Sequence, residues 1–168
     1  TRDPLTGLFN RRAIVEFLER EYSRSRRTGA PLAVLMLDLD HFKAVNDSYG
    51  HLNGDRVLEE VARRMEGAVR PYDSVGRYGG EEFLVALPDN TPESERIRRN
   101  VCGQTIALST SLISVTISVG VAVGQGGDLK QESWEWLVEQ ADEALYRAKQ
   151  LGRNRVELSH PLTGQKSQ

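Results

Sequence analysis

The sequence lacks the features that mark several broad classes of protein. It contains a single cysteine, Cys102, so no disulfide can form within the chain, which fits a reducing, cytoplasmic setting. No apolar run is long enough to span a membrane, and no signal peptide opens the chain. Neither sign of charge dominates, since the chain contains 22 basic and 24 acidic side chains. Nucleic-acid-binding domains are usually distinctly basic, so we expect neither a nucleic-acid partner nor contact between this domain and a membrane.

The rest of the composition is typical of a globular domain with a sizeable core. Of the 168 residues, 39% are hydrophobic and 27% are charged, and this length favours one domain. We expect the domain to cover residues 1–160 and residues 161–168 to form a disordered tail. The opening residues predict a polar turn that leads directly into a helix. We therefore expect the chain to be cut from a longer protein, with an upstream regulatory region left out.

Apolar residues recur with the periods of alternating helices and strands. Helices are predicted at about 13–28, 41–48, 57–69, 92–102 and 134–148. Strands are predicted at about 32–37, 74–78, 81–87, 113–123 and 155–158. Asn53 is expected to be the N-cap of the helix that continues to residue 69, and Gly79-Gly80 indicates a tight hairpin. This order predicts an α/β fold with a central mixed sheet flanked by helices.

Three carboxylates lie at the ends of predicted strands. Asp38 and Asp40 end a buried strand, where open α/β sheets tend to place ligands. Glu81 follows the glycine hairpin, so pairing of that hairpin with the first strand would bring Asp38 and Glu81 side by side. Such a pair offers the oxygen ligands that magnesium prefers, with phosphates completing the shell. Alternatively, the two aspartates cap the next helix and Glu81 is a solvated hairpin residue.

The two acidic motifs differ in how specific they are. Asp-x-Asp at 38–40 is a weak signal, for which a structural and a functional role have about equal weight. Gly-Gly-Glu-Glu-Phe at 79–83 is much stronger. A glycine turn with two acids beside it is a poor choice for stability alone, which favours a functional role for this hairpin.

Polar and basic residues elsewhere permit two interpretations. Lys149 and Arg153 lie at the end of the last helix, where the helix dipole favours cations, so an ordinary helix end is the simpler explanation. Together with Lys43, they would instead hold a triphosphate. Asn46 and Asp55 are either turn and capping residues or a pair that matches the hydrogen-bonding edge of guanine.

Other motifs either have simple explanations or exclude a kind of site. Arg70 and Asp73 are spaced for a surface ion pair, and Arg77 suits an exposed position on a strand. The three histidines lack the spacing of zinc ligands to any cysteine. No serine stands in a nucleophile-elbow motif. Zinc chemistry and serine hydrolysis are therefore not expected.

Taken together, these motifs resemble the GGDEF family of diguanylate cyclases, which is named after its signature. Here the signature is the glutamate variant at residues 79–83. Further segments that look like family motifs follow in the same order, at 3–12, 38–43, 46–47, 49–51, 54–55, 77–78 and 148–154. The resemblance covers the chain to about residue 158. It implies a fold similar to nucleotidyl cyclases and polymerase palm domains, with a ferredoxin-like core.

The resemblance also implies roles for individual residues. Asp38 and Glu81, with the carbonyl of Leu39, would bind Mg²⁺ or Mn²⁺, and Glu82 would line the catalytic site. The residues implied to bind the GTP substrate are Phe42, Lys43, Asn46, Asp55, Lys149 and Arg153. The residues implied to bind cyclic di-GMP as an inhibitory product are Arg70, Asp73, Arg77 and Arg96.

The implied activity is the condensation of two GTP molecules into cyclic di-GMP. One domain would carry one GTP, so two chains would meet as an antiparallel homodimer around the substrates. Two alternatives belong to other classes: a catalytically silent module that senses GTP or cyclic di-GMP, and an interaction domain whose acids are structural. Silent family members usually have a damaged signature, whereas the acids at 38, 81 and 82 are intact here, which favours the enzyme.

Overall fold

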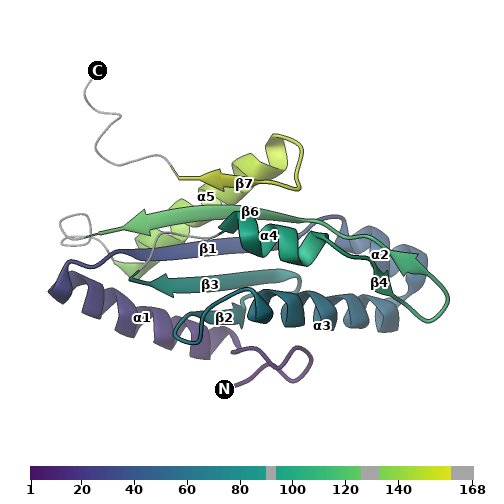
Figure 1. The fold of residues 1–168 in the computed structure, drawn as a ribbon, viewed down its shortest axis with the longest axis horizontal. Helices are drawn as coiled ribbons and strands as arrows, with labels where there is room; N and C mark the ends of the chain where they lie inside the picture. The colour runs from purple at the N-terminus through teal and green to yellow at the C-terminus, as the bar shows by residue number, and fades with distance from the viewer. Residues whose placement is uncertain (90–93, 126–132, 160–168) are drawn as a thin grey trace.

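The computed structural model describes residues 1–89, 94–125 and 133–159, and its centre is a sheet covered by helices on both faces (Figure 1). The five strands of this sheet are β1 (Leu32–Leu39), β2 (Ser74–Arg77), β3 (Glu82–Pro88), β6 (Ile117–Gly124) and β7 (Val156–Leu158). The helices are α1 (Arg11–Thr28), α2 (Phe42–Tyr49), α3 (His51–Gly67), α4 (Ser94–Cys102) and α5 (Trp134–Gln150). A separate two-stranded hairpin contains β4 (Ile106–Ala107) and β5 (Leu112–Ile113).

The sheet is mixed, as predicted, and β1 is its central strand. The strand order is β2-β3-β1-β6-β7. β1 runs antiparallel to both β3 and β6, whereas β6 and β7 are parallel. Along the chain, the main elements follow one another as β1, α3, β2, β3, α4 and β6. Combined with the strand order given above, this is the ferredoxin-like split βαβ arrangement. The apolar run at 32–37 becomes the central strand because only there are both of its faces buried.

Alternate side chains of β1 enter two different cores. One core lies under α3 and α4 and contains Leu35 and Leu37, and the other lies under α1 and α5 and contains Val34 and Met36. In Figure 1, α4 lies in front of the sheet and α5 behind it. β1 ends next to α2, so the polar residues that follow the strand lie at one end of the sheet.

Gly120 allows α5 to lie unusually close to β6. A Cβ atom at this position would lie 2.1 Å from the Ala141 carbonyl oxygen and 2.2 Å from the Leu145 nitrogen. Both are helix backbone atoms, which cannot move aside independently. The absence of a side chain at Gly120 therefore sets the distance between the sheet and the helix that ends near Lys149.

Two details of the predicted elements were wrong. α3 begins at His51 rather than after Asn53, because Gly50, with φ at 86°, joins α2 and α3 directly as the N-cap. The Asn53 side chain instead donates to the Tyr49 carbonyl oxygen at 2.8 Å. The predicted strand at 113–123 is interrupted, since β5 ends at Ile113 and β6 begins at Ile117.

Some predictions fall outside the described residues. These are the first two residues of the predicted helix at 92–102, part of the loop at 125–128, and the tail at 161–168. Within the described ranges, no helix combines the length and the apolar character needed to cross a membrane.

Candidate active site

Three acidic residues meet where β1 ends and β3 begins. Asp38 faces Glu82 directly in the antiparallel register. The Leu39 amide donates a hydrogen bond of 3.2 Å to the carbonyl oxygen of Glu81. The charge of Asp38 acts on both glutamates. The pairing of the first strand with the hairpin, on which the predicted site depended, is thus present.

The glycine hairpin that presents Glu81 is held on both sides. Its two ends are joined by a hydrogen bond of 2.8 Å from the Tyr78 amide to the Glu82 carbonyl oxygen. The Arg77 guanidinium donates to the Gly80 carbonyl oxygen at 2.8 Å and forms an ion pair of 3.3 Å with Asp3. Arg77 therefore fixes the turn and connects it to the N-terminal segment.

All three acids are harder to ionise than ordinary carboxylates. Burial raises the pKa of Asp38, and nearby Asp40 adds to this, although Lys149 acts in the opposite direction. Burial, followed by the charge of Asp38, raises the pKa of Glu81 and of Glu82. Burial is therefore the main reason that these three carboxylates are hard to ionise, and repulsion between neighbouring acids adds to it.

Two cations from the far end of the chain lie against these acids. The Lys149 ammonium, near the end of α5, donates to Asp38 Oδ2. Arg153 lies four residues further on, in a turn with φ at 64°, and its charge also acts on Asp38. Lys43 is different, because it is exposed and pairs with Asp47 of its own helix at 3.0 Å. An ordinary helix end does not explain Lys149, whose partner is a carboxylate on the central strand.

The donor set suits a hard divalent cation. Among residues 1–89, 94–125 and 133–159, no three histidine, cysteine, aspartate or glutamate side chains are arranged to hold a metal ion by themselves. The donors at hand are carboxylate oxygens with a surplus of negative charge, together with backbone carbonyls. Magnesium binds through one or two such carboxylates and completes its shell with phosphate and water oxygens. The residues present therefore fit Mg²⁺ or Mn²⁺ bound together with a nucleotide.

A second group of predicted residues lies where α2 packs on α3. Asn46 comes from α2 and Asp55 from α3, and both are half-buried. Gly54 lies against Asn46, since an added Cβ would come within 1.9 Å of Asn46 Oδ1 and 3.3 Å of Phe42 Cζ. Gly54 thereby lets the amide of Asn46 lie beside the start of α3, next to Asp55. Amide and carboxylate groups placed in this way can match the N1–H, the amino group and O6 of guanine.

Asp40 does not cap the following helix, so that alternative was wrong. The N-cap of α2 is His41, with φ at 57° and no capping hydrogen bond from its side chain. Asp40 is 6% exposed and accepts hydrogen bonds from Thr116, Ser118 and Asn154. Its partners lie more than 70 residues away, so no local pattern in the sequence could have indicated them.

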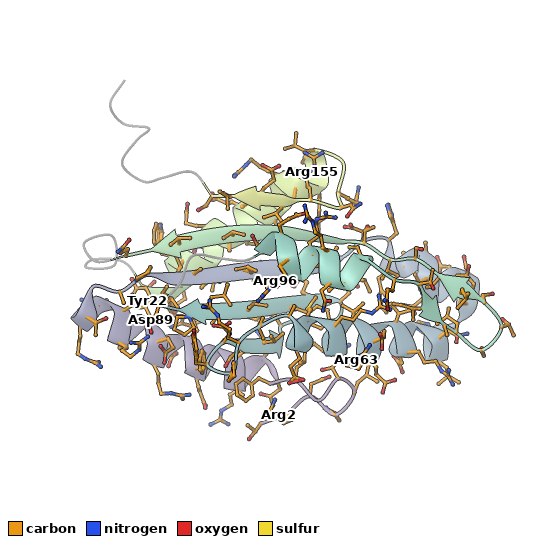
Figure 2. All side chains as sticks on the ribbon, in the orientation of Figure 1. Arg2, Tyr22, Arg63, Asp89, Arg96 and Arg155 are labelled. Atoms are coloured by element: carbon orange, nitrogen blue, oxygen red, sulfur yellow. The ribbon has the colours of Figure 1, made fainter. Side chains whose placement is uncertain are left out.

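The residues predicted to bind product lie in two places. Arg70 and Asp73 line a cavity of about 400 Å³, and Arg70 Nε and Asp73 Oδ1 are buried there without a hydrogen-bond partner. Arg96, labelled in Figure 2, reaches from α4 to the carbonyl oxygen of Ala68 at 2.7 Å, beside the same loop. Arg77 is not among the residues that line this cavity, because its guanidinium lies on the hairpin.

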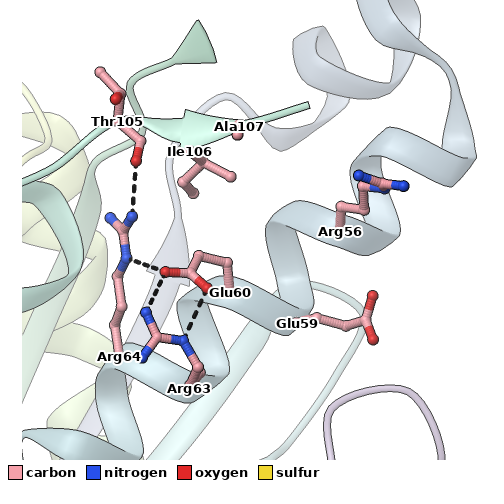
Figure 3. Close-up of a pocket in the computed structure, with 8 residues that line it drawn as sticks. All are labelled: Arg56, Glu59, Glu60, Arg63, Arg64, Thr105, Ile106 and Ala107. Atoms are coloured by element: carbon pink, nitrogen blue, oxygen red, sulfur yellow. Dashed lines mark hydrogen bonds and ion pairs between the residues drawn. The ribbon is translucent and has the colours of Figure 1, made fainter. Parts of the chain in front are cut away.

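A larger cavity near α3 has a structural explanation. It has a volume of about 600 Å³ and is lined by charged residues of α3 and by β4 (Figure 3). Arg64 is 7% exposed and donates to Glu60 and to the carbonyl oxygens of Val101, Gln104 and Thr105. Sequence reasoning missed this residue. Arg64 satisfies carbonyl groups at and beyond the end of α4, which explains why an arginine is buried there.

Comparisons with known proteins agree with this geometry. The family model described as "Diguanylate cyclase, GGDEF domain" matches residues 1–155. Diguanylate cyclase DgcP of Pseudomonas aeruginosa is 42% identical over 94% of this chain, and the chain spans 24% of DgcP. The solved GGDEF domain of DgcB from Caulobacter crescentus, in complex with c-di-GMP, is 34% identical with a TM-score of 0.87, over 96% of this chain and 94% of that one.

A further solved structure is described as the active GGEEF domain of a diguanylate cyclase from Vibrio cholerae. It is 30% identical with a TM-score of 0.82, over 92% of this chain and 99% of that one. The chain thus spans almost the full length of single-domain structures and about a quarter to a third of the longer curated relatives it matches. Since the family model and the curated relatives cover nearly all of the chain, this chain belongs to the GGDEF family of diguanylate cyclase domains.

Proposed function

We propose that this chain is the catalytic domain of a diguanylate cyclase that condenses two GTP molecules into cyclic di-GMP and two pyrophosphates. The observation that carries the proposal is that Asp38 lies opposite Glu82, next to Glu81, at one end of the sheet, while Lys149 pairs with Asp38 and the charge of Arg153 also acts on it. Acids alone would suit many metal sites. Acids with two cations beside them suit a metal-bound polyphosphate.

Each group of residues has a separate task in the proposed site. Asp38, Glu81 and the Leu39 carbonyl hold Mg²⁺ or Mn²⁺, and Glu82 lines the reaction centre. Lys149 and Arg153 hold the outer phosphates of GTP, with Phe42 and Lys43 beside them. Asn46 and Asp55 recognise guanine. The half-buried positions of Asn46 and Asp55 support this, because hydrogen bonds select a base best where water is excluded.

The reaction is a nucleotidyl transfer performed twice. The 3′-oxygen of one GTP forms a bond to the α-phosphorus of the other, the bond to the β-phosphate oxygen breaks, and pyrophosphate leaves. A bound divalent metal lowers the pKa of the attacking hydroxyl and neutralises phosphate charge. The protein contributes mainly by orientation, since in-line placement of two bound nucleotides removes several kcal/mol from the barrier, up to about 7–11 in well-oriented cases.

Two chains are needed, because the two GTP molecules must face each other. We propose an antiparallel homodimer in which each chain contributes Asp38 and Glu81. Activity per chain should then rise with protein concentration. A specific activity that stays flat over a hundredfold dilution series would contradict control by assembly.

The cavity at Arg70 and Asp73 is proposed to bind cyclic di-GMP as an inhibitor, with Arg96 beside it. Arg70 Nε lies 3.5 Å from Asp73 Oδ2 as an ion pair, but neither Arg70 Nε nor Asp73 Oδ1 has a hydrogen-bond partner, which supports this because buried polar groups normally have one. Arg77 would act there indirectly, through the hairpin.

Incubation of the protein with GTP and MnCl₂, followed by mass spectrometry of the nucleotides, tests the proposed activity. We expect cyclic di-GMP from the wild type, and none from Glu81→Gln, which should remain folded by circular dichroism. Glu59→Gln, an acid-to-amide change on the exposed side of α3, is the matched control and should retain activity. GTP binding without product in the wild type would indicate a silent sensor. Product from Glu81→Gln would show that the metal assignment is wrong.

A further inference from the structure

Asp40 is a buried charge that the proposed reaction does not use. Its carboxylate is 6% exposed, yet it lies only two residues after Asp38. Oδ2 accepts from the Thr116 hydroxyl at 2.7 Å and from the Asn154 backbone amide at 3.1 Å. Oδ1 accepts from the Ser118 hydroxyl at 2.7 Å. A buried carboxylate needs such donors, and these three satisfy both oxygens of Asp40.

Asp40 and its donors belong to three segments that are distant in sequence. Thr116 directly precedes β6 and Ser118 lies at its start, on one side of β1. Asn154 belongs to the turn that leaves α5. In this turn Gly152, Arg153 and Asn154 have φ values of 119°, 64° and 47°. Residues other than glycine enter the left-handed region at a cost, so a turn with two of them in succession needs support from outside.

The turn that needs this support carries Arg153. Its outside contacts include the Asp40 bond to the Asn154 amide, and bonds from Arg98 and Cys102 of α4 to the Asn154 side chain. The Arg153 amide in turn donates to the Ala148 carbonyl oxygen at 2.9 Å, which joins the turn to the last residues of α5 beside Lys149. Asp40 is therefore hydrogen-bonded to the residue that follows Arg153, and Arg153 is one of the two cations whose charge acts on Asp38.

A direct role as a metal ligand fits these contacts poorly. A carboxylate has about four lone-pair sites, and three hydrogen-bond donors already occupy Asp40. A purely structural role would affect stability alone. Because Asp40 is attached to the turn that carries Arg153, we expect its loss to weaken the binding of phosphate by that turn as well.

We propose that Asp40 is a positioning residue, which holds the turn at 152–154 so that Arg153 and Lys149 meet the triphosphate of GTP. This rests on the proposed function, in which those two cations bind the outer phosphates. Loss of the hold weakens the binding of GTP in the ground and transition states alike. It therefore raises the KM for GTP more than it lowers kcat.

Three variants separate positioning from the alternatives. Asp40→Ala removes every acceptor. Asp40→Asn keeps the shape, and its amide oxygen can accept from Asn154 and Thr116 while its amide nitrogen donates to the Ser118 hydroxyl, so only the charge is lost. Asn154→Gly keeps the backbone amide, tolerates a positive φ and removes only the side chain. The measurements are KM and kcat for GTP with MnCl₂, and hydrogen exchange of the Asn154 amide by NMR.

We expect Asp40→Ala to raise the KM for GTP about tenfold with kcat lowered less than threefold, and to expose the Asn154 amide to exchange. Asp40→Asn should keep KM within about threefold, and Asn154→Gly within about twofold. In the Arg153→Ala background, Asp40→Ala should raise the KM for GTP less than it does in the wild type, because one of the two cations through which Asp40 acts is already gone.

Opposite results would overturn the proposal. If the wild type makes product and Asp40→Ala has the same KM for GTP as the wild type, Asp40 only stabilises the fold. If Asp40→Ala does not fold, Asp40→Asn decides: loss of product as complete as for Glu81→Gln identifies Asp40 as a metal ligand. A wild type without product overturns the proposed function instead. In that case, hydrogen exchange of the Asn154 amide in Asp40→Ala still tests whether Asp40 holds the turn at 152–154.

Discussion

The Lys149 ammonium is paired with the Asp38 carboxylate, which lies 111 residues earlier in the sequence. The pair joins the end of α5 to the end of the central strand, and the Lys149 and Asp38 side chains are 32% and 10% exposed. Lysine here supplies part of the positive charge that the acids need. A divalent cation on Asp38 would compete with Lys149 and release it toward the phosphates of a bound nucleotide.

Lys149→Met should therefore have opposite effects on metal and on nucleotide. Without nucleotide, we expect Mn²⁺ to bind several-fold more tightly, because a competing cation has been removed from Asp38. With nucleotide, the KM for GTP should rise about tenfold, because one phosphate contact is lost. Titration followed by electron paramagnetic resonance measures the first effect and steady-state kinetics the second. Arg12→Met, on exposed α1, is the control and should change neither. Weaker Mn²⁺ binding by Lys149→Met would refute competition at Asp38.

Gly54→Ala should impair GTP recognition without weakening the fold. The new Cβ would lie 1.9 Å from Asn46 Oδ1, which is the mobile end of a side chain and can move away. Alanine also favours the helix over glycine by about 1 kcal/mol. We expect unchanged or higher Tm and a KM for GTP raised at least about tenfold.

Gly67→Ala is the matched control for Gly54→Ala. It lies at the end of the same helix, and nothing is within 4 Å of an added Cβ. Its KM for GTP should equal that of the wild type. If both variants keep the wild-type KM, Asn46 does not contact the guanine.

Glu82→Gln should stabilise the protein near neutral pH while lowering activity. Burial, Asp38 and Asp142 raise the pKa of Glu82, so the folded state binds the proton more tightly than the unfolded state. The ionised carboxylate therefore costs stability, and this cost grows as pH rises above the ordinary value of 4.5. We expect a Tm higher by only about 2 °C at pH 7.5, because Glu82 is half-exposed and water screens its charge. The difference should vanish at pH 4; a Tm that falls at pH 7.5 would contradict the assigned repulsion.

Arg64→Ala should destabilise the fold strongly. It would leave Glu60 without a partner on one side and deprive the Val101, Gln104 and Thr105 carbonyls of their donor. We expect a loss of about 3 kcal/mol in the free energy of unfolding, measured by urea denaturation. Arg63→Ala is the control on the preceding residue: its side chain is 72% exposed, so its loss should cost far less stability than the loss of Arg64. Equal losses would mean that the buried contacts of Arg64 are not the cause.

Arg70→Ala should relieve inhibition by product. The side chain lines the cavity with Asp73, its ion-pair partner, and has a buried Nε without a hydrogen bond. We expect the concentration of cyclic di-GMP that halves the initial rate to rise at least about tenfold, because one charged partner of the phosphate is lost. The initial rate without product should stay unchanged. Unaltered sensitivity to added cyclic di-GMP would remove this cavity from the proposed regulation.

The central strand and its pairing could be predicted from the sequence for a physical reason. A continuous apolar run such as 32–37 is stable only where both faces are covered, and a Gly-Gly turn between two strand-like runs favours a hairpin. These two features are enough to suggest that Asp38 and Glu81 are neighbours. The antiparallel register confirms that β1 pairs with the hairpin strand β3, and it sets Asp38 opposite Glu82, one residue from Glu81.

The remaining contacts depend on tertiary packing and leave no local trace. Asp40 gave only a weak motif, because its partners at Thr116, Ser118 and Asn154 come from other elements. Arg64 looked like one more surface charge on an amphipathic helix, although it is buried under the end of α4. The predicted N-cap at Asn53 failed because a glycine with positive φ can start a helix without a capping side chain.

The contact of Gly120 with α5 has a consequence for how inactive variants should be interpreted. A methyl group at Gly120, which pairs with Met36 in the middle of the sheet, would push α5 away from β6. Because α5 is rigid, its far end would tilt, and the ammonium group there would lose its alignment with the strand. A variant of Gly120 would then be inactive because the distance between the sheet and α5 has changed, although every reacting group is intact.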